Sequence, residues 1–119
     1  MINEIESWLT GLVEDDPIPY EIKHMIFFYT NANNCFVLKM GGFEILPKKV
    51  YEPDFFPLEA QFVFHRELLK IKDNHYFEEF VKKEIDDAFY SSHLKNQFKN
   101  RKVYFSQFGK SPQFLFNVN

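Results

Sequence analysis

The chain has 119 residues, of which 45% are hydrophobic and 26% charged, and its formal net charge is −3. This length predicts one domain, residues 1–119, that buries roughly two-thirds of its unfolded surface. The single cysteine, Cys35, excludes an intramolecular disulfide and a cysteine-rich zinc site, and is typical of a reducing compartment. The sequence has no apolar run near the ~20 residues that cross a bilayer. We therefore expect a soluble, cytoplasmic protein without membrane contact.

Composition points to a source, and the charge distribution to two alternatives. Sixteen phenylalanines accompany twelve lysines and only two arginines, a bias that AT-rich codons produce and that we take to indicate a bacterial protein. Residues 1–22 hold six acids and no base, whereas residues 88–119 hold five bases and no acid. Either the two ends pair in the folded protein, or the basic end binds an anion.

Hydrophobic periodicity predicts an amphipathic helix over residues 2–13. Its apolar positions recur at the i, i+3, i+4 and i+7 spacing that places side chains on one stripe. They are Ile2, Ile5, Trp8, Leu9, Leu12 and Val13. Pro17 and Pro19 then end the helix, because proline cannot continue helical hydrogen bonding.

The segment 24–46 predicts a three-stranded antiparallel meander. Residues 31–34 indicate a four-residue loop, and Gly41-Gly42 indicates a two-residue hairpin turn that pairs Lys39 with Glu44. One face would hold the core residues Met25, Phe27, Tyr29, Phe36, Leu38, Met40, Phe43 and Ile45. The other face would carry an apolar patch of the kind that monomers rarely leave open. Its residues are Ile26, Phe28, Val37 and Leu46.

The rest of the chain predicts helices followed by two strands. A helix is expected over 57–72, with a short strand through Gln61–Phe64 as the competing interpretation, and a second helix over 75–90. A further helical turn and two strands would follow, at 102–108 and 113–118. The expected fold class is α+β, an antiparallel sheet of four to five strands (meander plus C-terminal hairpin) packed with an N-terminal helix and two to three further helices. The expected order is α-β-β-β-α-α-β-β.

No stretch carries catalytic or metal-ligating residues at recognisable spacing. The expected register places His24 and Cys35 roughly 20 Å apart on their strands. His65, His75 and His93 lack the spacing of metal ligands. Cys35 has no neighbouring cation or helix N-terminus to activate it as a nucleophile. We therefore expect no metal, no cofactor and no catalytic residue, and the sequence weighs against an enzyme without excluding one.

Gln61 and His65 form a first candidate binding pair. They lie four residues apart on the predicted 57–72 helix, within its apolar side, where buried polar groups must find hydrogen-bond partners. One interpretation is a pocket with aromatic walls that binds a small apolar ligand. The competing interpretation is that the pair anchors neighbouring backbone.

A second candidate site is the basic segment that contains Lys95, Lys99, Arg101 and Lys102. Bases interleaved with aromatic residues are typical of anion or single-stranded nucleic-acid contacts. The acidic pI of about 5.8 and the near absence of arginine weigh against nucleic acid. Cations at a helix C-terminus also have a purely structural explanation, because they complement its dipole.

The favoured hypothesis is a non-enzymatic protein-interaction domain that uses the apolar second sheet face. It would be a homodimer or other homo-oligomer, or the dedicated partner of another protein, as chaperones, adaptors and immunity-type proteins are. The element order and acidic pI resemble those of the small chaperones of type III secretion, although those end in a helix. Because this chain is predicted to end in a strand, the resemblance concerns the fold alone. The small apolar ligand and the anion contact are the alternatives.

Overall fold

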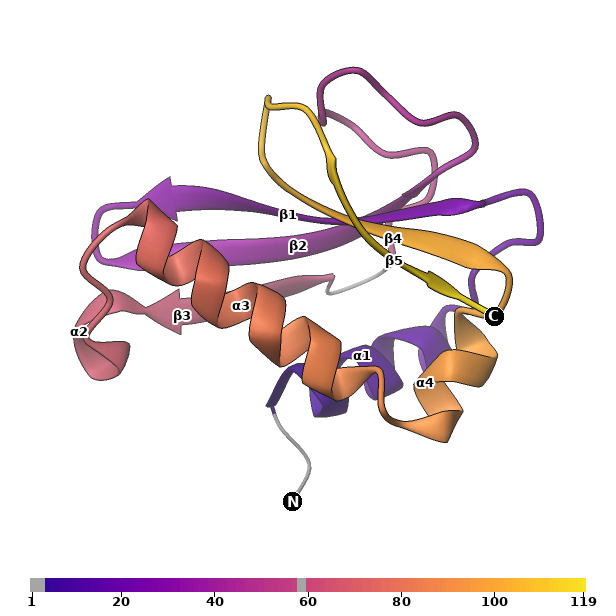
Figure 1. The fold of residues 1–119 in the computed structure, drawn as a ribbon, viewed down its shortest axis with the longest axis horizontal. Helices are drawn as coiled ribbons and strands as arrows, with labels where there is room; N and C mark the ends of the chain where they lie inside the picture. Colours follow the sequence, from indigo (N-terminus) through magenta and orange to yellow (C-terminus); the bar gives the residue numbers. More distant parts are fainter. Residues whose placement is uncertain (1–3, 58–59) are drawn as a thin grey trace.

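The computed structural model describes residues 4–57 and 60–119. Within these residues five strands form one sheet in the order β3-β2-β1-β4-β5, with helices beneath it (Figure 1). The strands are β1 (His24–Ala32), β2 (Cys35–Phe43), β3 (Gln61–His65), β4 (Arg101–Gln107) and β5 (Gln113–Val118). The helices are α1 (Glu4–Asp15), α2 (Arg66–Leu69), α3 (Asn74–Ala88) and α4 (Ser92–Gln97). The predicted α+β class is confirmed.

The sheet is mixed, whereas the sequence predicted an antiparallel one. β1 pairs with β2 antiparallel on one side and with β4 parallel on the other. Helices α3 and α4 carry the chain back beneath the sheet from β3, so that β4 enters beside β1 in the same direction (Figure 1). Parallel pairing requires such a crossover connection. The C-terminal hairpin of β4 and β5 forms as predicted.

The predicted hairpin turn at Gly41-Gly42 is wrong, because β2 runs straight through both glycines. Gly41 pairs with Ile26 and Gly42 with Met25, both on β1. Among the described glycines, only Gly109 has the positive φ that a tight turn requires. Both glycines instead permit close packing. A Cβ on Gly41 would lie 2.6 Å from Pro53 Cβ. The predicted strand at 43–46 does not form, so Phe43 packs on the second face and Ile45 is exposed.

The turn between β1 and β2 is also shorter than predicted. Ala32 pairs with Cys35, so the loop contains only Asn33 and Asn34. Tyr29 therefore lies opposite Leu38, two positions from the expected partner. Because side chains alternate with a period of two, a shift of two residues leaves the side chains from Met25 to Met40 on their predicted faces.

Residues 61–65 form the third strand, so the predicted 57–72 helix is wrong there and the competing strand interpretation is confirmed. Residues 58 and 59 of that predicted helix lie outside the described residues. β3 pairs antiparallel with β2, placing Phe64 opposite Phe36. Phe62 packs against Trp8 of α1, with ring centroids 5.6 Å apart. Among the described residues of this segment, only the four of α2 are helical. Alternate aromatic positions thus outweighed the helical propensity of the flanking residues.

The core lies between the sheet and the helices α1, α3 and α4. The described part of the predicted 2–13 helix buries Ile5, Leu9, Leu12 and Val13, while Ile2 lies outside the described residues. α3 begins where the Asp73 side chain accepts a hydrogen bond from the Tyr76 N–H. Its inward residues are Phe77, Val81, Ile85 and Ala88. From the sheet, Met25, Phe27, Tyr29, Phe36, Leu38 and Met40 face this core, as predicted.

Residues 44–57, from the connection between β2 and β3, cover part of the second sheet face. Val50 is fully buried there against Ile26, Phe28, Phe43 and Tyr104. Its backbone N–H donates to the Lys110 carbonyl at 2.8 Å, and its carbonyl accepts from the Gly109 N–H at 2.7 Å. The connection is therefore held on the sheet by the β4–β5 turn, and it closes a second, smaller apolar cluster.

Candidate functional site

The structure divides the predicted apolar patch into covered and open parts. Ile26 and Phe28 are buried beneath residues 44–57, so they are closed to a partner in this structure. Val37 is half-buried on β2, and Leu46 is 40% exposed in the connection. The premise that the second face is open is therefore correct only in part.

Gln61 and His65 do not lie on a helix. Both are exposed and lie on β3, on the sheet face opposite the core, where His65 pairs with Cys35 and Gln61 with Lys39. The predicted pocket assumed that these side chains share the apolar side of a helix, and their position on a strand shows that they do not. Neither residue lines the hollows described below.

The basic segment is not one surface. The Arg101 guanidinium donates to carbonyl oxygens of the α1–β1 connection, including Ile22 at 2.8 Å and Pro19 at 3.0 Å. Burial lowers the pKa of Arg101, but an arginine stays protonated, so these are charge-assisted bonds. Lys102 pairs with His24 at the start of β1, whereas Lys95 lies on α4, beneath the sheet. The acidic and basic ends of the chain do meet, chiefly through backbone carbonyls.

The titratable residues do not converge on a catalytic or metal centre in the described part of the chain. No group of three or more His, Cys, Asp or Glu side chains there could hold a metal ion. Cys35 is a half-buried free thiol. His24 Nδ1 lies 2.9 Å from the Tyr104 hydroxyl, and burial together with Lys102 lowers the pKa of His24. This contact links two neighbouring strands on the second face.

Tyr29 is the principal buried titratable group. Its ring is enclosed by Phe36, Phe77 and Phe105, and its hydroxyl donates to the Glu78 carboxylate on α3. Burial, then the adjacent carboxylate, raises the pKa of Tyr29 well above its ordinary value of 10.0. This contact is structural, because it joins the central strand to the longest helix inside the core.

Stability should consequently fall above pH 10. The unfolded Tyr29 loses its proton near pH 10, whereas the folded one keeps it, so each further pH unit costs up to about 1.4 kcal/mol of unfolding free energy. Urea titrations at pH 9, 10 and 11 should show this slope, and Tyr29→Phe should reduce it. Burial also raises the pKa of Tyr104, which accounts for a residual slope. In the exposed control Tyr20→Phe, a slope as small as that of Tyr29→Phe would contradict the assignment.

Three exposed aromatic side chains surround a small hollow on the second face. Tyr51 is 53%, Phe56 48% and Phe108 41% exposed, and all three line a hollow of about 80 Å³ whose floor includes Phe28. The Tyr51 and Phe108 rings meet edge-on, with centroids 5.6 Å apart. Lys39, Glu52 and Pro53 complete its lining. We call Tyr51, Phe56 and Phe108 the aromatic patch.

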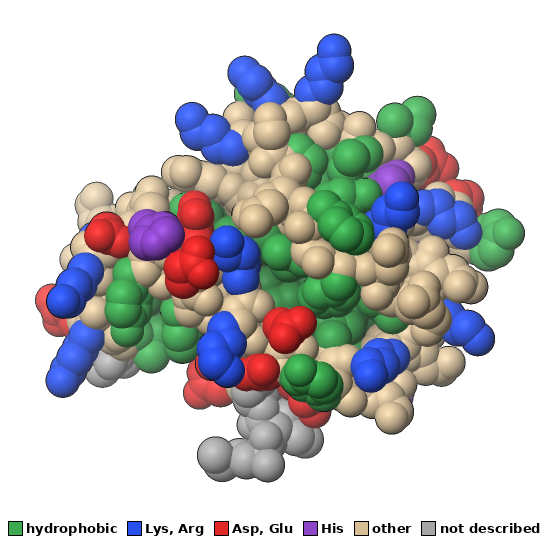
Figure 2. Space-filling view, in the orientation of Figure 1, with side chains coloured by type: hydrophobic (Ala, Val, Ile, Leu, Met, Phe, Trp, Pro, Cys, Tyr) green, Lys and Arg blue, Asp and Glu red, His purple; other side chains and the backbone are tan. Residues whose placement is uncertain are grey.

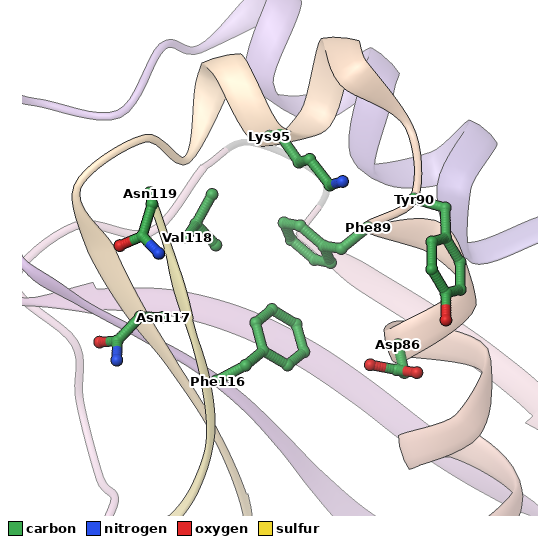
Figure 3. Close-up of a pocket in the computed structure, with 8 residues that line it drawn as sticks. All are labelled: Asp86, Phe89, Tyr90, Lys95, Phe116, Asn117, Val118 and Asn119. Atoms are coloured by element: carbon green, nitrogen blue, oxygen red, sulfur yellow. The ribbon is translucent and has the colours of Figure 1, made fainter.

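A larger hollow of about 370 Å³ lies between α3, α4 and β5 (Figure 3). Its apolar lining comprises Phe89, Phe116 and Val118, with the Phe89 and Phe116 ring centroids 5.3 Å apart. Its other lining residues are Asp86, Tyr90, Lys95, Asn117 and Asn119. In the orientation of Figure 1, hydrophobic side chains gather near β5 and are bordered by acidic and basic groups (Figure 2). We call this the α3–α4–β5 hollow.

Sequence reasoning overlooked most of these residues. Tyr51 and Phe56 come from the proline-rich segment 47–57, for which the sequence predicts no helix or strand. Phe108 ends the predicted strand 102–108, but it lies in the β4–β5 turn. A usable signal was present, because aromatic residues in an irregular, proline-rich connection have no regular core position to fill. Lys95 was identified, but as an anion contact along the chain and not as part of a hollow.

The chain matches no protein-family model, no curated protein and no solved structure in the comparisons made. Function is therefore inferred from geometry and chemistry alone. None of the helices in the described residues is both long and apolar enough to span a membrane.

Proposed function

We propose that this protein is a protein-interaction domain that binds its partner through the aromatic patch on the second sheet face. The carrying observation is that Tyr51, Phe56 and Phe108, each about half exposed, line one hollow. Aromatic side chains are enriched at the centres of protein interfaces, where they supply a large buried area. Contiguous exposed apolar surface of this kind marks interaction sites.

The patch has the rigidity that favours binding. Phe108 contacts the buried Phe28, with ring centroids 6.1 Å apart, and Tyr51 packs edge-on against Phe108. Val50, next to Tyr51, is held by two backbone hydrogen bonds to the β4–β5 turn. Side chains that are already ordered lose less conformational entropy when a partner binds. The Phe28–Phe108 contact and the hydrogen bonds of Val50 therefore hold the aromatic patch in place for the proposed partner.

Site-specific photo-crosslinking tests this function. The protein with p-benzoylphenylalanine in place of Phe56 is expressed in the cells of its source organism and irradiated there. It should give one discrete adduct. The same replacement at Tyr20, which is 83% exposed outside the patch, is the matched control and should give none. Intact mass identifies the partner: twice the 14.4 kDa of one chain indicates a homodimer, and any other mass another protein. Equal labelling from both positions, or none from position 56, would refute the proposal.

A second variant separates binding from folding. Phe108→Ser removes an exposed ring of the aromatic patch. In the protein that carries the crosslinker at position 56, this substitution should lower the adduct yield at least fivefold, because a few aromatic residues supply most of the binding energy of an interface. Phe28→Asp is unsuitable, since Phe28 is buried and a charge there would unfold the protein. Far-UV circular dichroism should show that Phe108→Ser stays folded. An unchanged adduct yield in that folded variant would contradict a role for the patch.

A further inference from the structure

The α3–α4–β5 hollow lies on the core side of the sheet, where the two helices leave β5 uncovered. α3 ends at Ala88, and the short turn through Tyr90 redirects the chain into α4. Because β5 is the edge strand, no neighbouring strand continues the sheet over this opening within the described residues. A volume of about 370 Å³ falls within the range of roughly 300–1,000 Å³ that small-molecule sites occupy.

The apolar part of the hollow is rigid. Phe89 and Val118 are 6% and 5% exposed, and Phe89 packs edge-on against the fully buried Phe98 at 4.8 Å between centroids. Phe116, from β5, also packs against Phe89 (Figure 3). Two aromatic rings and a valine anchored in the core form a preformed apolar surface for a planar or aliphatic group.

Charged groups of both signs stand around this apolar surface. The Lys95 side chain extends from α4 toward the space between Phe89 and Tyr90, and Asp86 stands on α3 on the side of Tyr90 (Figure 3). The Lys95 ammonium makes no ion pair or hydrogen bond with any described residue. The carboxylate of Asp86 adds an acceptor to the same rim.

From this arrangement we infer that the hollow binds a small zwitterion with an apolar ring, of the chemical class of the aromatic amino acids. The ring lies against Phe89 and Phe116, the carboxylate binds Lys95, and the ammonium binds Asp86. A plain hydrophobic acid would make no ion pair with Asp86, and a plain amine would make none with Lys95. A molecule with both charges satisfies both rim groups. This site is independent of the aromatic patch, which lies on the other face of the sheet.

NMR titration of the ¹⁵N-labelled protein tests the inference directly. L-phenylalanine and L-tryptophan are the probes, and phenethylamine, which lacks the carboxylate, is the matched comparison. We expect saturable shifts of the Phe89, Lys95 and Val118 amides with at least one amino acid, and at least tenfold weaker binding of phenethylamine. Shifts that do not saturate at millimolar concentrations of both amino acids would overturn the inference, as would equal binding of the amine.

Variants at the rim complete the test. Lys95→Met keeps the apolar stem of the side chain but removes its charge, and should weaken amino-acid binding at least tenfold. Lys99→Met changes an exposed lysine that does not line the hollow and should bind like the parent protein. Both substitutions are on exposed positions, so both variants should fold. Equal affinities of the two variants would exclude Lys95 as the carboxylate-binding residue and overturn the inference.

Discussion

Replacing Gly42 by alanine is expected to destabilise the protein by about 1–3 kcal/mol, the cost of overpacking a close-packed interior. An added Cβ would lie 2.4 Å from Ile22 Cγ2, 3.2 Å from Met25 Sδ and 3.3 Å from a carbon of the Phe55 ring. Ile22 and Met25 are buried, so they have little room to move away. At about 4 °C per kcal/mol, thermal unfolding followed by circular dichroism should detect the loss.

Gly11 provides the matched control within the same chain. It lies inside α1, and an added Cβ there would meet nothing within 4 Å. Gly11→Ala should therefore stabilise the protein by about 0.5–1 kcal/mol, because alanine loses less backbone entropy in a helix. The two glycine variants are thus expected to shift stability in opposite directions. A neutral or stabilising Gly42→Ala would contradict the close packing of Gly42 against Ile22 and Met25.

Arg101→Met should cost about 2–3 kcal/mol, since hydrogen bonds from charged groups contribute roughly 1.5–3 kcal/mol and the carbonyls left behind lose their donor. The guanidinium donates to Ile18, Pro19 and Ile22 in the α1–β1 connection. It also donates to Gln97 and Lys99, at the end of α4. One side chain therefore joins the α1–β1 connection, the end of α4 and the start of β4. Urea unfolding of the variant measures the loss.

Two further variants identify the cause. Arg101→Lys keeps the charge but not the planar fork of donors, so it should recover less than half of the lost stability. Lys102→Met, at the adjacent exposed position, should change stability by no more than about 0.5 kcal/mol. If Arg101→Lys matched the parent protein, charge alone would explain the effect and the carbonyl contacts would be incidental.

The two proposed sites lie on opposite faces of one sheet and use different chemistry. The aromatic patch is open and aromatic, with Lys39 and Glu52 at its hollow, and suits a protein surface. The α3–α4–β5 hollow has the larger volume of the two. It combines an apolar surface with charges of both signs, and it suits a small molecule. Crosslinking from Phe56 and titration at Lys95 can therefore succeed or fail independently.

The sequence alone determined the helices and strands whose apolar residues recur with the period of the element and so form one buried face. The 3.6-residue stripe in α1 and α3 and the period-two alternation from Met25 to Met40 placed these residues correctly on the core side. The same patterns predicted β4, β5 and the α+β class. Register errors at the β1–β2 turn did no harm to these assignments, since a shift of two residues preserves the face.

Only the tertiary structure decided the role of the two glycines, the strand at Gln61–His65 and the sites. In the sequence, a glycine pair indicates a turn. The structure shows instead that Pro53 and Ile22 pack closely on these glycines, a contact that local sequence cannot predict because both residues are distant in the chain. Residues 61–65, which the sequence predicts as part of a helix, form a strand because pairing with β2 and packing on the core stabilise them more than helical propensity does. The aromatic patch and the α3–α4–β5 hollow likewise arise from segments that meet only in the folded protein. No spacing of residues along the sequence therefore predicts them.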